Sequence, residues 1–174
     1  TTQEPSYARD ASMPTQGASA TPETPEVPTA SALDSRPRFT PSSPADAVPE
    51  SSISAERFFD PDYDAVLHAM IDHVVQHEGP VLDITLARRI ARAHGFQRTG
   101  SRIQERIETL AQPRFAHSEE TAGTFYWPSG TLPDNDIPFR WPENDSQARS
   151  LDDICEQELH SLARYVLAEG KRRL

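Results

Sequence analysis

Residues Asp62–Trp127 decide the fold of this 174-residue chain. The stretch begins at Asp62 with DYDAVLHAMIDHVVQHEGPVLDITLARRIARAHGFQRTGSRIQERIETL, and after two more residues it continues as PRFAHSEETAGTFYW. Apolar residues recur at helical spacing in three successive segments of the first part. The second part holds two short segments rich in aromatic residues, which predict a pair of strands.

Start and stop signals delimit the three predicted helices. They place the helices at about Pro61–His77, from Asp83 to a stop at Gly95, and from Thr99 or Ser101 to a stop at Pro113. Asp60 is the expected N-cap of the first helix, and Ser101 with Gln104 resembles a capping box at the third. Three amphipathic helices are therefore packed closely along the chain.

A hairpin and a further helix follow. The hairpin strands are expected at Arg114–His117 and Thr121–Trp127, with SEETAG as the turn between them. The last helix is expected within Leu151–Glu169, ended by Gly170. Its apolar stripe is wide enough to cover one face of a domain and consists of Ile154, Cys155, Leu159, Leu162, Val166 and Leu167.

Three helices followed by a hairpin is the element order of a winged helix-turn-helix. We therefore expect a mainly α domain with a small β-hairpin and a C-terminal helix, over residues 55–174. Residues 1–54 are rich in Pro, Ser and Thr and predict a disordered linker. A docking peptide around Arg36–Phe39 is the alternative for part of that linker. Phe58 and Phe59 are the expected first contacts with the domain.

The charge of the chain is uneven. The net charge of −10 argues against a nucleic-acid-binding surface that covers the whole protein. Residues 83–114, however, hold seven arginines against three acidic residues. The basic character is therefore local and belongs to the second and third predicted helices.

No catalytic or metal-binding pattern accompanies these helices. P-loop, G-x-S-x-G and H-E-x-x-H motifs do not occur in the sequence, so we expect no enzymatic activity, catalytic residue or cofactor in this chain. His73 and His77 are four residues apart but have no third ligand nearby, so no metal site is predicted. Cys155, the single cysteine, is expected to be buried. No apolar run is long enough to span a membrane, and we expect a cytoplasmic protein.

In a winged helix that binds DNA, the third helix enters the major groove and the hairpin contacts phosphates. The predicted DNA-binding residues are Arg98, Thr99, Ser101, Arg102, Gln104, Arg106 and Arg114. Four acidic residues oppose this prediction, namely Glu105 and Glu108 in the third helix and Glu119 and Glu120 at the expected hairpin tip. If they interrupt the positive surface, a protein-interaction module that docks on a larger protein or self-associates becomes the better hypothesis.

Three sequence blocks carry a resemblance to a known family. They are E-G-P from Glu78, L-A-R-R-I-A-R from Leu86 and R-T-G-S-R-I from Arg98, and a D-D-I…E-L helix start follows from Asp152. The chain from about Ala65 to Ala168 resembles an uncharacterised domain at the C-terminal end of large bacterial superfamily 1 DNA helicase-like proteins. In those proteins the domain follows a nuclease domain similar to very-short-patch-repair endonucleases. His94 departs from the family pattern, in which Trp or another aromatic residue is expected.

The resemblance implies a setting of DNA processing, in which the parent protein is an ATP-dependent helicase and nuclease. The helicase and nuclease domains of that parent would then be partners of this chain, and their active-site residues would lie outside it. We therefore expect a non-catalytic accessory domain that contacts DNA through its third helix and wing.

Overall fold

The computed structural model describes residues 35–172, which lie in one compact unit that spans Ser35–Leu174. The disorder predicted for residues 1–34 lies outside the described residues. Four α-helices and two small sheets make up the described part. In chain order the elements are β1 (Arg38–Phe39), η1 (Pro44–Ala47), η2 (Glu50–Ser52), η3 (Pro61–Tyr63), α2 (Asp64–Glu78), β2 (Val81–Leu82), α3 (Asp83–Ala93), α4 (Ser101–Ala111), β3 (His117–Glu120), β4 (Gly123–Tyr126), β5 (Trp141–Pro142), η4 (Asp145–Gln147), η5 (Leu151–Asp153) and α5 (Glu156–Arg172).

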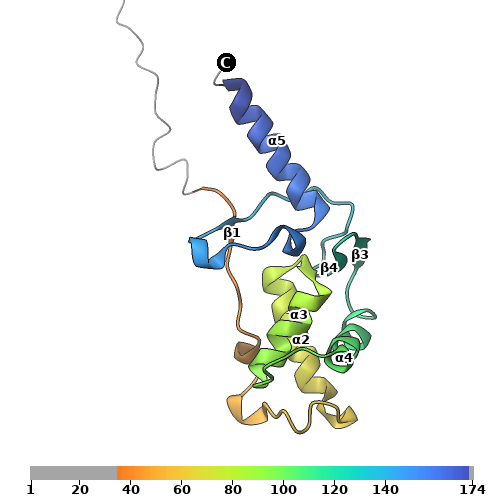
Figure 1. Ribbon diagram of the computed structural model, residues 1–174. Coiled ribbons are helices and arrows are strands. Elements are labelled where there is room, and N and C mark those ends of the chain that lie inside the picture. Colours follow the sequence, from red (N-terminus) through yellow and green to blue (C-terminus); the bar gives the residue numbers. More distant parts are fainter. Residues whose placement is uncertain (1–34, 173–174) are drawn as a thin grey trace, which may run out of the picture. The chain divides into compact units, whose positions relative to one another are not determined.

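The main core lies between α2, α3 and α4, and a three-stranded sheet packs against it (Figure 1). The strand order of this sheet is β2–β4–β3, and both pairings are antiparallel. Val81 pairs with Tyr126, which in turn pairs with His117 on its other side. β2 was not predicted, because a strand of two residues is too short to show alternation.

The hairpin lies at a different register from the predicted one. Strands were expected at Arg114–His117 and Thr121–Trp127, whereas β3 begins three residues later than its prediction and β4 is shorter than its prediction at both ends. Only two residues separate the strands, so Glu119 and Glu120 lie within β3 and not at the tip. The predicted six-residue turn is therefore wrong.

Gly123 sets the start of β4. Its φ of +141° is a conformation that side chains with a Cβ rarely adopt, and an added Cβ would lie 3.0 Å from Cδ1 of Leu82. The backbone N–H of the next residue, Thr124, donates to Oδ2 of Asp83 at 3.3 Å. Asp83 therefore connects the first turn of α3 to the sheet.

The helix starts differ from prediction in their capping. Gly100 is the N-cap of α4 and no side chain caps this end, so the capping box expected from Ser101 and Gln104 does not form. Asp60 precedes η3 and not an α-helix, and its side chain makes no capping bond. The ends predicted from glycine are more accurate, since α2 ends before Gly79 and α3 before Gly95.

The segment 35–54 packs on the domain, although it was assigned to the linker. β1 pairs in parallel with β5, and Phe39 is buried. The Arg36 guanidinium lies 4.7 Å from the ring centre of Trp141 and 4.9 Å from that of Tyr165. The residues considered as a docking peptide thus dock within the same chain.

Phe58 and His94 occupy an aromatic cluster beneath the start of α2. Phe58 is fully buried, as expected, and its ring lies edge-on to His94 at 5.0 Å and to Phe96 at 5.2 Å. His94 Nδ1 lies 2.8 Å from the carbonyl oxygen of Ile90, and Nε2 lies 2.9 Å from the hydroxyl of Tyr63. Burial lowers the pKa of His94. The histidine therefore fills the place of an aromatic residue and also satisfies polar groups in the core.

The last helix differs most from its prediction. α5 begins at Glu156, continues past Gly170 to Arg172, and extends away from the rest of the unit (Figure 1). Cys155, just before the helix, is buried as predicted, whereas Val166 is 57% exposed. The stripe therefore does not cover a face of the domain. Helical spacing shows which residues share a face, but not how much protein lies opposite that face.

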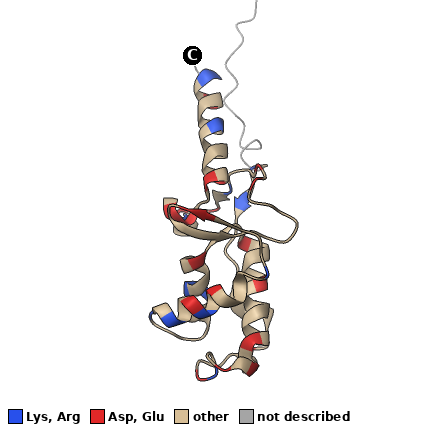
Figure 2. Cartoon of the chain, turned by 90° about the vertical axis from the view of Figure 1, so that its right-hand side faces the viewer, with Lys and Arg blue, Asp and Glu red and all other residues tan. Residues whose placement is uncertain are grey.

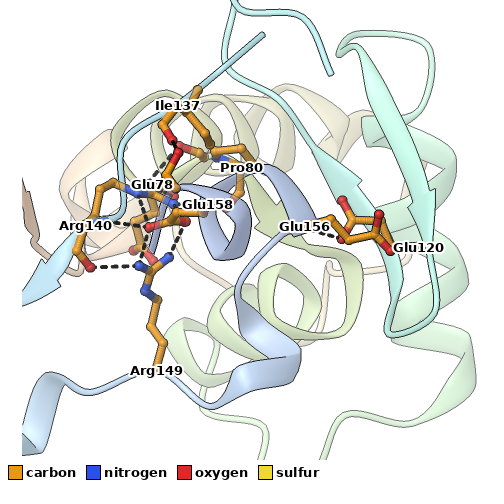
Figure 3. A network of polar contacts seen from close by, with 10 residues as sticks. Glu78, Pro80, Glu120, Ile137, Arg140, Arg149, Glu156 and Glu158 are labelled. Atoms are coloured by element: carbon orange, nitrogen blue, oxygen red, sulfur yellow. Dashed lines mark hydrogen bonds and ion pairs between the residues drawn. The ribbon is translucent and has the colours of Figure 1, made fainter. Parts of the chain in front are cut away.

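The base of α5 is fixed by a buried carboxylate, Glu158 (Figure 3). Arg140 donates to it from its backbone N–H at 2.8 Å and from Nη2 at 2.9 Å. Arg149 donates from Nη1 at 2.9 Å and also from Nη2. Arg140 Nη1 further donates to the carbonyl oxygens of Glu78 at 2.6 Å and Gly79 at 2.8 Å. Arg140 thus joins α5 to the end of α2, and Arg149 adds a second cation to the same carboxylate.

The ionisation of Glu158 should make stability dependent on pH. Burial alone would raise the pKa of its carboxyl, but the hydrogen bonds from Arg149 and Arg140 outweigh burial and lower the pKa from 4.5 to about 2. The unfolded chain therefore takes up this proton at a higher pH than the folded chain. The stabilisation is complete above pH 4.5 and is lost as the pH falls towards 2.

Replacing Glu158 with Gln should lower the free energy of unfolding by about 3–5 kcal/mol, because two buried guanidinium groups lose their counter-charge. Urea unfolding at neutral pH measures this loss. Glu156→Gln, at an exposed position two residues away, should have an effect below about 0.5 kcal/mol. Equal losses in both variants would contradict a specific role for Glu158.

Candidate nucleic-acid interface

The surface predicted to contact DNA is built by α3, the turn after it and α4. Each helix turns one apolar face towards the core. The buried residues of α3 are Leu86, Ala87, Ile90 and Ala91, and those of α4 are Ile103, Ile107, Leu110 and Ala111. The arginines lie between these positions, so the same periodicity that packs the helices places Arg88, Arg92 and Arg102 at exposed positions.

The turn between the helices has a defined geometry. Gly95 has φ +81° and follows the last residues of α3. The N–H of Phe96 then donates to the carbonyl oxygen of Ala91 at 3.0 Å, and the Phe96 ring packs against Phe58. The hydrogen bond and the ring contact of Phe96 fix the turn, and Arg98 follows in the exposed loop immediately before α4.

Arg98 and Arg102 remain available for a ligand. Both are exposed, and neither has an acidic partner among the described residues. The Arg102 guanidinium lies 4.7 Å from the ring centre of Phe59, which is 40% exposed. Such a contact orients the guanidinium without neutralising its charge.

Arg106 and Arg114 are engaged within the protein. Arg106 pairs with Asp64 at the start of α2, and its Nη2 donates to the carbonyl oxygen of Asp60 at 3.1 Å. Arg114 Nε donates to Oδ1 of Asp72 at 3.1 Å, and its Nη2 also donates to that carboxylate. The hydrogen bond with Asp72 raises the pKa of Arg114. These two predicted site residues thus form ion pairs with carboxylates of α2.

The three uncharged residues of the predicted site differ in exposure. Ser101 is exposed, whereas Thr99 and Gln104 are half-buried. Ser101 is the first residue of α4, and no side chain caps this helix end. The positive end of the helix dipole therefore lies beside Arg98 and Arg102.

A pocket of about 330 Å³ adjoins α3 and extends the basic surface. Four arginines line it, namely Arg88, Arg89, Arg92 and Arg149. Two of the four are neutralised: Arg89 Nη2 is 2.9 Å from the buried Glu78 carboxylate, and Arg149 pairs with Glu158. Arg88 and Arg92 have no acidic partner in the described part of the chain. Helical periodicity predicts that these two point away from the core, but no sequence signal places them in a site.

The hairpin carries the opposite charge. Residues 115–139 contain no lysine or arginine, while Glu119 is exposed in β3. Figure 2 shows acidic colour on the hairpin, whereas the helices below the sheet carry both basic and acidic residues. The positive surface therefore ends at the helices and does not continue onto the predicted wing.

Within residues 35–172, no group of three or more His, Cys, Asp or Glu side chains is arranged to hold a metal ion. His73 and His77 lie with ring centres 4.2 Å apart, but His77 Nδ1 lies 2.7 Å from the His73 carbonyl oxygen, where it can donate a hydrogen bond. Over the same residues, no helix is both long and apolar enough to cross a bilayer.

Arg106→Ala should reduce stability more than Arg102→Ala, although the two arginines are one turn apart on α4. Arg106 loses a half-buried ion pair and a hydrogen bond, at a cost of about 1.5–3 kcal/mol. Arg102 loses one contact with a partly exposed ring, at a cost of about 0.5–1 kcal/mol. Thermal and urea unfolding measure the difference, and equal costs would contradict the distinction between structural and available arginines.

Comparison with known families matches residues 56–105 to the family described as "Protein of unknown function (DUF3320)". The matched segment contains α2, β2, α3 and the first turn of α4, and so includes the turn that carries Arg98. Neither a curated protein nor a solved structure matches the chain. Residues 56–105 are therefore similar to an uncharacterised domain, and the similarity covers the candidate interface.

Proposed function

We propose that residues 55–172 form a winged-helix domain that contacts DNA and does not itself catalyse a reaction. The order of α2, β2, α3, α4, β3 and β4 and the antiparallel sheet β2–β4–β3 support this proposal. In this arrangement α3 and α4 are the helix-turn-helix pair, and α4 is the recognition helix.

The start of α4 carries the proposal. Arg98 and Arg102 present two unpaired guanidinium groups there, beside an uncapped helix N-terminus. Guanidinium groups and free N–H groups at a helix start both bind phosphate oxygens. Arg88 and Arg92 on α3 add positive charge to the neighbouring helix. The available cations thus concentrate on the helix-turn-helix part of the domain.

The acidic hairpin limits this mode of binding. An exposed Glu119 repels phosphate, so the hairpin should lie away from the DNA backbone. Contact would then depend on a few arginines, which gives modest affinity and a strong dependence on salt. Sequence-specific readout is not part of the proposal.

We further propose that this domain is an accessory part of a bacterial helicase–nuclease, as its sequence resemblance implies. The match of residues 56–105 to an uncharacterised family is compatible with that setting. In such a parent protein, the helicase and nuclease domains would act on the DNA and this domain would hold it. A cytoplasmic location follows from the same proposal.

Fluorescence anisotropy of the full chain with labelled duplex, single-stranded and forked DNA tests the proposal. At about 50 mM salt we expect dissociation constants in the micromolar range, which weaken steeply towards about 200 mM. Arg98→Gln/Arg102→Gln should weaken binding and reduce the salt dependence by about two released ions. A preference for forked DNA would indicate action at a helicase junction.

Arg38→Gln/Arg164→Gln is the matched control. It removes the same charge from β1 and α5, which lie at the other end of the described unit from α4 (Figure 1). This variant should bind DNA as the unmodified chain does. Absence of binding at low salt, or equal weakening in the two double variants, would contradict a specific interface at the start of α4.

The second candidate function is a protein-interaction module. It is favoured by the lack of any lysine or arginine in residues 115–139, because an acidic hairpin suits a basic protein surface better than DNA. In this case the hairpin and not α4 would bind, and Glu119→Lys/Glu120→Lys would abolish the interaction. Binding of DNA by the unmodified chain together with loss in Arg98→Gln/Arg102→Gln would reject it for this surface.

A further inference from the structure

α5 carries an apolar face that no described part of the chain covers. Leu159 and Leu162 near its base are half-buried, while Val166 is 57% and Leu167 is 66% exposed. With 3.6 residues per turn, these positions and Ala163 fall on one side of the helix. The same side is continuous with Cys155, which is buried against Leu82, Phe125 and Trp127. The face that attaches α5 to the body thus continues outward and becomes exposed.

A hollow of about 660 Å³ adjoins the base of this face. Its apolar lining includes Leu159 of α5 and two side chains that are themselves exposed, Ile84 at 39% and Leu151 at 71%. The apolar surface therefore extends from the hollow along α5 towards its free end. Exposed apolar surface of this extent typically marks an interaction site.

The charges at the two ends of this surface are opposite. Four acidic residues and one basic residue, Arg88, line the hollow; the acidic residues are Glu120, Asp152, Asp153 and Glu156. Asp152 and Glu156 are exposed and form no ion pair with another described residue, while the other end of α5 carries the exposed Lys171. Arg172 lies on the other side of the helix and pairs with Glu169. Figure 2 shows basic colour at the free end of α5, and Figure 3 shows Glu120 beside Glu156 at its base.

We propose that the occupant of this surface is α5 of a second copy of the chain, packed antiparallel. The apolar face of α5 has its midpoint near Ala163. In an antiparallel pair, Leu167 of one copy therefore lies opposite Leu159 of the other. The same alignment brings Lys171 of each copy to the acidic hollow of the other. The surface is therefore complementary to itself under a two-fold axis, as a symmetric dimer requires.

The small residues on this face allow close approach of two helices. Ala163 is exposed, and an added Cβ at Gly170 would contact nothing within 4 Å. Because α5 has 17 residues, the helix pair is only about 25 Å long. We therefore expect a dimer of micromolar affinity. Contacts at the hollow and between the charged ends should make this affinity higher than that of one short helix pair alone.

Sedimentation equilibrium of the full chain from about 1 µM to about 100 µM tests the dimer. The mass should rise from the 19.4 kDa of one chain to twice that value. Ala163→Glu places a charge on the apolar face and should leave the chain monomeric over the whole range. Ala168→Glu is the matched control, because it makes the same change at another exposed alanine of α5 that lies on the opposite side.

Circular dichroism checks that both variants keep their helical content. A monomeric unmodified chain at all concentrations, or the same mass for the two variants, would overturn the proposal. DNA binding by Arg98 and Arg102 does not enter either measurement, so the two proposals fail independently.

The antiparallel orientation has its own test. Under mild oxidation Ala163→Cys should form a disulfide between copies, because residue 163 lies near the two-fold axis. Gly170→Cys should not, because antiparallel packing separates the two copies of this position by several turns. Burial raises the pKa of Cys155 to about 11, so the native thiol should stay unreactive. Efficient cross-linking at both positions would indicate parallel helices and overturn the proposed orientation.

Discussion

A buried ion cluster around Glu158 fixes how the parts of this unit meet. The carboxylate lies at the base of α5, and its two arginines come from the segment that leads from the sheet to that helix. Arg140 also bonds the last carbonyl groups of α2, while Arg149 stacks 4.4 Å above the ring centre of Phe39 in β1. Four stretches that are distant in sequence therefore depend on one negative charge. A cluster of this kind adds little net stability compared with an apolar replacement, but it penalises every arrangement in which one member is missing. It thus selects a single packing for segments that contribute few apolar residues of their own.

The parts of the fold that could be predicted are those with a local signal. Periodic apolar residues and the breaks at Gly79 and Gly95 predict the end of α2 to within one residue and the start of α3, while α2 begins three residues later than predicted. Long-range features could not be predicted in the same way. β2 has two residues, β1 is defined only by its pairing with β5, and the partners of Glu158 lie in a proline-rich segment without periodicity. The end of α5 was missed because Gly170 lowers helix propensity without forbidding a helix, and here nothing else opposes continuation through it.

In the candidate site, too, local features could be predicted and long-range contacts could not. Sequence patterns identified the arginines of α3 and α4 as exposed positions, but could not separate those with an acidic partner from those without. Arg102 and Arg106 are one helical turn apart, and only the position of Asp64 on another helix makes one of them structural. The carboxylates that neutralise Arg106 and Arg114 both come from α2. Arg106 and Arg114 therefore contribute to helix packing. The two arginines without an acidic partner, Arg98 and Arg102, lie at the start of α4.

The parallel pairing of β1 with β5 has a mechanical consequence. Near β1, a backbone hydrogen bond of 2.8 Å from Trp141 to Pro37 holds this segment, and the Arg36 guanidinium contacts the rings of both Trp141 and Tyr165. A pulling force on residue 35 acts on these contacts before it reaches the helical core. Separation of β1 from β5 would move Phe39 away from Arg149. Water could then reach the guanidinium groups that bind Glu158 at the base of α5. We therefore expect tension on this segment to loosen the attachment of α5 before it disturbs α2, α3 and α4.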